Sequence, residues 1–126
     1  MGAHRLQDLS LIGRDTLLKE LTDFDLYHLR HVERLTLQRA ADGEAFDLSV
    51  EAVYQAEREY LVTLVFAGVK STRLPELSPS FFFGELEIED LRDAQLEGIR
   101  YRARDFSENG FDVHCQELRL ERITPR

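Results

Sequence analysis

Hydrophobic and polar residues alternate with a period of two over most of the chain, which is the pattern of half-buried β-strands. Two such runs, Val32 to Gln38 and Phe46 to Tyr54, are separated by a segment containing Asp42-Gly43, a dipeptide that favours tight hairpin turns. The next run, Tyr60 to Val69, is apolar at nearly every position, which predicts a strand covered on both faces. Further strands are expected at Phe82 to Asp90, Ile99 to Phe106 and Phe111 to Ile123.

The first part of the chain has a helical period instead. Asp15 can accept backbone hydrogen bonds at a helix start, and leucines recur on one face until the helix ends near Asp23 to Asp25. A weaker helical turn is expected within Leu26 to His31. Two prolines make Lys70 to Ser80 a loop. The whole pattern predicts one mainly-β (α+β) domain over residues 1–126: a six-stranded antiparallel meander with one N-terminal helix, forming a sandwich or a half-barrel.

Glutamates and arginines alternate with apolar residues on two neighbouring predicted strands. If these strands form a hairpin, opposite charges face each other across it, which contributes a few tenths to about 1 kcal/mol for each pair. A slip by one residue would bury the charges, so the pairs mainly fix the register. The expected pairs are Glu85 with Arg104, Glu87 with Arg102 and Glu89 with Arg100.

The last predicted strand has apolar residues of both parities. One parity holds Phe111, Val113 and Cys115, and the other holds Leu118 and Leu120. One extra residue reverses the alternation of a strand. We therefore predict a β-bulge near Gln116 and Glu117 that brings both sets to the core.

The formal net charge is −8, and acidic residues occur in both halves of the chain. A negative surface repels phosphate and anionic lipid, so we expect neither nucleic acid nor membrane as a partner, and it steers basic proteins towards the chain. The single cysteine excludes an intrachain disulfide. Met1 to Ile12 lacks the apolar run of a secretory signal, and no run approaches the roughly 20 residues that span a bilayer. We expect a cytoplasmic protein.

Few residues carry the marks of chemistry. His28 and His31 have the spacing that places two imidazoles on one helical face, but no second His/Cys pair completes a zinc site. His114 adjoins Cys115, and neighbours on a strand point to opposite faces, so Cys115 is expected to be a buried small hydrophobe. We predict no catalytic residue, metal or cofactor, and no enzymatic activity.

Phe81-Phe82-Phe83 must send at least one ring away from the core, because side chains alternate along a strand. Such a ring could pack under the neighbouring loop, or it could form an exposed apolar anchor for a partner or for a second copy in a homodimer. The residues predicted to bind a partner are the acids at the following turn and the flanking rings: Glu89, Asp90, Asp93, Phe81 and Phe83.

Short motifs in the second half of the chain resemble a group of small bacterial all-β proteins. These motifs are Glu87 to Asp90 at a strand end, Gln95 to Gly98 at a turn, and the alternating final strand with its cysteine; His28 to Leu37 is also similar. Some members of that group resemble predicted immunity proteins of polymorphic toxin systems. The resemblance implies a protein that binds, by masking a basic toxin. The alternatives from the residues are a small-ligand or metal-binding domain using His28, His31 and His114, and a self-associating structural protein.

Overall fold

The computed structural model describes residues 24–41, 43–74, 81–91, 98–106 and 110–126. Strands are present at all the predicted places, within a few residues of the predicted bounds. The elements are η2 Leu26–His28, β1 Leu29–Arg39, β2 Phe46–Gln55, β3 Glu59–Arg73, β4 Leu86–Asp90, β5 Tyr101–Asp105 and β6 Asp112–Pro125.

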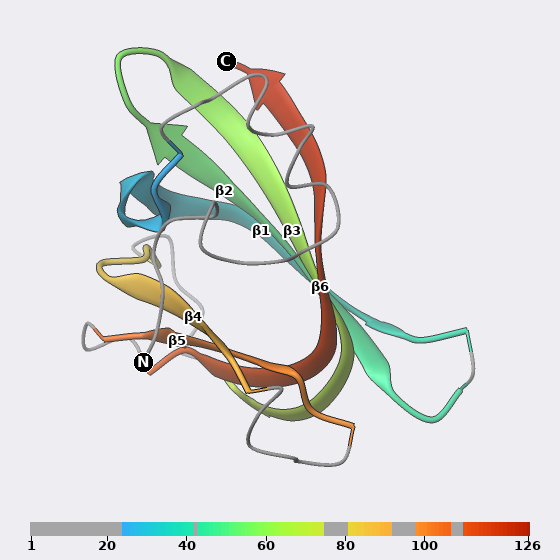
Figure 1. Cartoon of the computed structure of the whole chain (residues 1–126). Coiled ribbons are helices and arrows are strands. Elements are labelled where there is room, and N and C mark those ends of the chain that lie inside the picture. The colour runs from blue at the N-terminus through green and yellow to red at the C-terminus, as the bar shows by residue number, and fades with distance from the viewer. Residues whose placement is uncertain (1–23, 42, 75–80, 92–97, 107–109) are drawn as a thin grey trace.

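All six strands belong to one open sheet in the order β1-β2-β3-β6-β5-β4, and every neighbouring pair is antiparallel. The long strands β3 and β6 bend and so belong to both halves of the sheet, which curls around its inner face (Figure 1). The two outer regions meet where His31 of β1 bridges Phe82, just before β4. Of the two predicted arrangements, a single curled sheet corresponds to the half-barrel and not to the sandwich.

The N-terminal helix of the predicted fold is not borne out. The residues from Asp15 to Asp23 lie outside the described part of the chain, and the only helical element within that part is the short 3₁₀ helix η2. This helix falls inside the segment where the weaker turn was predicted. Asp25 caps it by accepting a hydrogen bond from the backbone N–H of Tyr27 at 3.0 Å. None of the described helical residues forms a segment able to cross a membrane.

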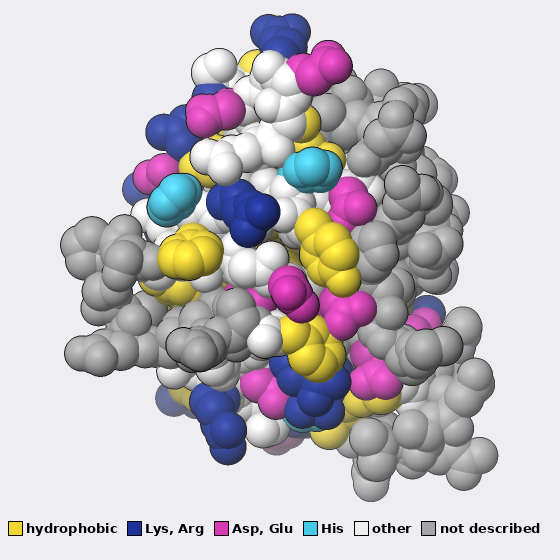
Figure 2. Space-filling view, turned by 90° about the vertical axis from the view of Figure 1, so that its left-hand side faces the viewer, with side chains coloured by type: hydrophobic (Ala, Val, Ile, Leu, Met, Phe, Trp, Pro, Cys, Tyr) yellow, Lys and Arg dark blue, Asp and Glu magenta, His cyan; other side chains and the backbone are white. Residues whose placement is uncertain are grey.

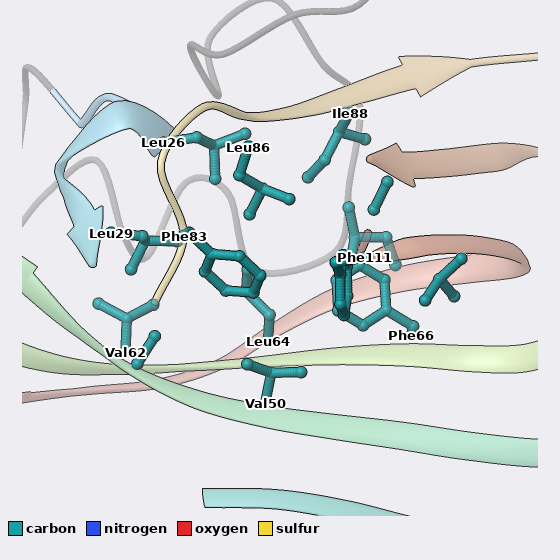
Figure 3. Close-up of a cluster of buried hydrophobic side chains, with 14 of the residues drawn as sticks. Leu26, Leu29, Val50, Val62, Leu64, Phe66, Phe83, Leu86, Ile88 and Phe111 are labelled. Atoms are coloured by element: carbon teal, nitrogen blue, oxygen red, sulfur yellow. The ribbon is translucent and has the colours of Figure 1, made fainter. Parts of the chain in front are cut away.

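The core lies between the two halves of the curled sheet. Figure 3 shows the rings of Phe66, Phe83 and Phe111 there, brought together from β3, from the segment before β4 and from the residue before β6. The ring of Phe111 lies 5.1 Å from that of Phe83 and 6.1 Å from that of Phe66 between centroids. Edge-to-face contacts of this kind add to the burial of apolar surface.

The parity change predicted for the last strand is present, with a different cause. Cys115 and Leu118 are both buried, although the two residues between them would place their side chains on opposite faces of a regular strand. β6 keeps its register with β3 from Ala67–Glu117 to Val69–Cys115, and the shifts of this pair lie on either side, between Thr63 and Leu64 and between Val69 and Ser71. A further shift, between β2 and β3, lies next to Gly68 at φ +65°. The bulge predicted near Gln116 and Glu117 was therefore wrong in position: no register shift with β3 falls there, and Gly68, opposite Gln116, lies at a shift between β2 and β3.

The hairpin of β4 and β5 has the predicted faces but a different register. Glu87 pairs with Arg104 and Glu89 with Arg102, two residues away from the predicted pairs. A shift of two residues leaves every charge on the same face, so alternation could exclude a slip of one residue and not a slip of two. Glu85 precedes β4, where its carbonyl accepts a hydrogen bond from the N–H of Phe106 at 3.1 Å.

Candidate partner-binding face

Exposed or half-buried aromatic rings and carboxylates occur on η2, on the segment before β4 with β4 itself, and at the end of β5. We call this surface the aromatic-acidic face, and it consists of Tyr27, Phe82, Glu85, Glu87 and Phe106. Phe82 and Phe106 are each 47% exposed, far more than core aromatic residues. Figure 2 shows this side of the molecule, where hydrophobic, acidic, basic and histidine side chains alternate.

The short helix η2 presents Tyr27 at this face. Leu26 is fully buried, and Phe24 stacks on Tyr54 with ring centroids 4.7 Å apart. The N–H of Asp25 donates to the hydroxyl of Tyr54 at 3.2 Å. These contacts hold the turn against the core on both sides of Tyr27, so its half-buried ring has a fixed position.

Backbone pairing determines which phenylalanine is displayed before β4. The N–H of Val32 donates to the carbonyl of Phe81 at 3.3 Å, and the N–H of Phe83 donates to the carbonyl of Arg30 at 2.8 Å. The segment is therefore extended, and Phe82 points the opposite way from its neighbours. Its ring lies 6.1 Å from that of His31.

A buried carboxylate holds the turn that leads into β4. Asp105 is 4% exposed and accepts hydrogen bonds from the backbone N–H groups of Gly84 at 3.0 Å and Glu85 at 2.7 Å. Charge-assisted bonds of this kind are stronger than neutral ones. They connect the end of β5 to the start of β4, so Phe106 and Glu85 are kept side by side.

Burial and the nearby carboxylates both affect the pKa of Tyr27. Partial burial raises the pKa of Tyr27 because it disfavours the charged phenolate, and the negative charges of Glu87, Glu85 and Asp25 raise it further. Tyr27 is thus a neutral hydroxyl among carboxylates at neutral pH. A ring with a neutral polar tip and acidic neighbours suits a partner that offers basic side chains.

Arginines border the face on β5. The guanidinium of Arg104 lies over the ring of Phe106, 4.2 Å from its centroid. Arg102 makes a bidentate pair with Asp112, with distances of 3.0 and 2.8 Å from Nε and from a terminal nitrogen to the two carboxylate oxygens. The hydrogen bond from Arg102 holds the pKa of Asp112 below its usual range. Arg102 is thus paired with Asp112, whereas Arg104 lies opposite Glu87 and keeps its positive charge at the border of the face.

The structure places the residues predicted to bind a partner in different environments. Phe81 and Phe83 are 8% and 1% exposed, so neither ring is available as a surface anchor, and the displayed ring is Phe82 between them. A carboxylate oxygen of Asp90 lies 3.8 Å from a terminal guanidinium nitrogen of Arg100. Glu89 lines a small hollow of about 10 Å³ together with Glu87, Phe106 and two arginines, Arg102 and Arg104. Asp93 lies outside the described residues.

Sequence reasoning missed Tyr27 and Phe106. For Phe106 a signal exists: on β5 the apolar positions are Tyr101 and Ala103, so Phe106 has the parity of the arginines, where a large apolar ring is out of place on a solvated face. Tyr27 carried no such signal, because its partners Glu85 and Glu87 are distant in sequence.

The residues proposed for metal or small-ligand binding do not converge. In the described part of the chain, no group of three or more histidine, cysteine or carboxylate side chains is arranged to hold a metal ion. His28 and His31 are exposed near the start of β1, whereas His114 lies opposite Arg102 on β6. Cys115 is fully buried, as predicted, and burial raises the pKa of its thiol to about 12.

A second hollow, of about 320 Å³, lies on the outer face of β1, β2, β3 and β6. Thr63 and Val65 lie in it, and acidic and basic side chains surround it in equal measure: Arg34, Arg119, Arg122, Asp47, Glu51 and Glu121. None of the histidines lines it. Its charges largely compensate one another, with Nε of Arg34 3.5 Å from a carboxylate oxygen of Glu51.

A curled, single-sheet domain with a built face of rings and carboxylates has the form of a protein-binding module. The family model described as Immunity protein PIM8 matches residues 15–121. The chain therefore belongs to the PIM8 family of immunity proteins, which confirms the resemblance to immunity proteins noted from its sequence. No curated protein and no solved structure matched the chain in the other two comparisons.

Proposed function

We propose that this chain is a non-enzymatic immunity protein of the bacterial cytosol that binds a basic protein toxin and masks it with the aromatic-acidic face. Membership of the family implies a protein partner, a toxin. The observation that carries the assignment of the face is the display of Phe106 beside Glu85 and Glu87, with a second exposed ring, Phe82, on the segment that leads into β4.

The electrostatics support a basic partner. The chain carries a formal net charge of −8, and opposite charge accelerates encounter and suppresses unsuitable partners. Exposed rings then supply the apolar area that anchors an interface, since aromatic residues are enriched in the buried centre of such contacts. Charge and rings occur together at this face.

The state of the candidate nucleophile supports binding over chemistry. Cysteine acts as a nucleophile through its thiolate, and a pKa of about 12 leaves Cys115 protonated at neutral pH. Its side chain is also fully buried among core residues. Cys115 is thus suited to packing.

We extend the proposed interface to the acidic turn after β4. Glu89 continues the face, because it lines a hollow with Glu87 and Phe106, which Arg102 and Arg104 border. Asp90 and Asp93 follow in sequence and would meet a partner that covers both the face and the turn. Phe81 and Phe83 contribute by packing beneath, where they fix the direction of Phe82.

Affinity capture tests the proposed function. The tagged chain, incubated with lysate of its source, is expected to retain one dominant basic protein in near-equimolar amount, quantified by mass spectrometry. That protein is expected to arrest bacterial growth when expressed alone and to lose this effect when the chain is expressed with it. Recovery of background proteins only, or of a partner without toxicity, would contradict the proposal.

A further inference from the structure

The distal part of β1 is an open sheet edge. β1 is the first strand in the sheet order, and beyond Val32 no described strand pairs with its outer side. The residues from Thr36 to Arg39 are all exposed, and Leu37 is 49% exposed. Figure 1 shows this end of the β1–β2 hairpin projecting away from the other strands. An edge of this kind can pair with another strand unless the sequence opposes it.

The hydrogen-bonding direction along this edge follows from the hairpin. The N–H of Ala40 donates to the carbonyl of Ala45 at 2.9 Å, and the register with β2 is regular from Arg34 to Arg39. In an antiparallel pair, bonded and non-bonded positions alternate. The N–H and carbonyl groups of Leu35, Leu37 and Arg39 therefore point away from β2, towards the open side.

The sequence along the edge complements itself about Thr36. An antiparallel pairing with a two-fold axis at Thr36 places Leu35 opposite Leu37 of the second copy, with both sets of outward backbone groups facing each other. It places Arg34 opposite Gln38 of the second copy. Glu33 lies in the irregularity before Arg34, where its carboxylate accepts a hydrogen bond from Arg126 at 3.1 Å, so it adds no charge pair to the argument. An axis at Leu35 would set Leu37 against Glu33, and an axis at Leu37 would set Leu35 against Arg39. Only the axis at Thr36 pairs both leucines with leucines.

We propose that the chain forms a symmetric dimer through antiparallel pairing of two β1 edges, centred on Thr36. The second copy covers Leu37 with its own Leu35 and extends the sheet across the two-fold axis. The hollow lined by Arg34, Thr36 and Gln38 then lies beside its symmetry mate. This inference is independent of the proposed toxin binding, because the aromatic-acidic face is built from other elements.

A cysteine placed on the axis tests the register. Facing residues at a non-bonded antiparallel pair have Cβ atoms about 4.5–5.5 Å apart, near enough for a disulfide after small adjustment. Thr36→Cys is therefore expected to give a covalent dimer under mild oxidation. Gln38→Cys, on the same strand and face, is the control. In the proposed dimer the two cysteines at position 38 are four residues apart along the strands, about 13 Å, and should not form a crosslink. The native Cys115 is buried and does not interfere.

The mass in solution completes the test. Sedimentation of the wild type is expected to show a dimer at micromolar concentrations, and Leu37→Pro a monomer, because proline removes an N–H that pairs across the axis and that β2 does not use. Leu37→Val keeps that N–H and should remain dimeric. A monomeric wild type, or equal crosslinking of Thr36→Cys and Gln38→Cys, would overturn the proposal. Either result leaves toxin capture unaffected.

Discussion

The double variant Phe82→Lys/Glu85→Lys is expected to bind the toxin about 100-fold more weakly than the wild type. Truncating an aromatic anchor in an interface costs about 2 kcal/mol or more, and about 1.4 kcal/mol corresponds to a factor of ten in affinity. The change also converts one carboxylate into a cation at the centre of the face, so it repels a basic partner. Both side chains are exposed, so the fold should persist. Calorimetric titration measures the effect, and circular dichroism verifies the fold.

A matched variant distinguishes the effect of charge at the aromatic-acidic face from the effect of the net charge of the whole chain. Phe46→Lys/Glu44→Lys makes the same two kinds of replacement at exposed residues of the β1–β2 hairpin, far from the aromatic-acidic face. It alters the net charge equally and is expected to retain the affinity of the wild type within a few-fold. Equal losses in the two variants would show that overall charge, and not this face, governs binding.

Replacing Asp105 by alanine is expected to lower the free energy of unfolding by about 2–4 kcal/mol. The substitution leaves the N–H groups of Gly84 and Glu85 without their acceptor in a buried site, and each unsatisfied donor is costly. It also releases the turn that sets Phe82 and Glu85 in place. Urea denaturation measures the stability, and titration with the toxin should show weaker binding even where the variant remains folded.

The control for Asp105→Ala is Asp112→Ala, in the more exposed ion pair of Asp112 with Arg102. Asp112→Ala removes the partner of Arg102, but that pair is partly solvated, with both side chains more than a fifth exposed, so the expected loss is below about 1 kcal/mol. If Asp105→Ala lowers the free energy of unfolding no more than Asp112→Ala does, the buried carboxylate does not hold the turn.

The strands could be predicted because alternation depends only on neighbours in sequence. The faces of β4 and β5 were predicted for the same reason, whereas their register was not, since Glu87 meets an arginine whether it pairs with Arg102 or with Arg104. What distinguishes the two registers is a distant contact, the carboxylate of Asp105 binding the backbone before β4. Alternation alone contains no information about that contact.

The composition of the proposed face followed only in part from the sequence. The sequence indicated that one ring of Phe81-Phe82-Phe83 leaves the core, but the direction depends on pairing with Arg30 and Val32 in β1. That pairing arises from the curl of the sheet, which joins segments about 50 residues apart in the chain. Tyr27 enters the face by the same curl, because η2 lies against β4.

The most direct test of the account is the residual activity of the purified toxin as the chain is added in increasing molar ratio. Masking by a bound protein predicts a linear loss of activity that ends near one chain per toxin, and recovery of activity when the complex is separated. Loss of activity at far lower ratios, without recovery, would mean that the chain modifies its partner chemically. That result would contradict a binding role for this immunity protein.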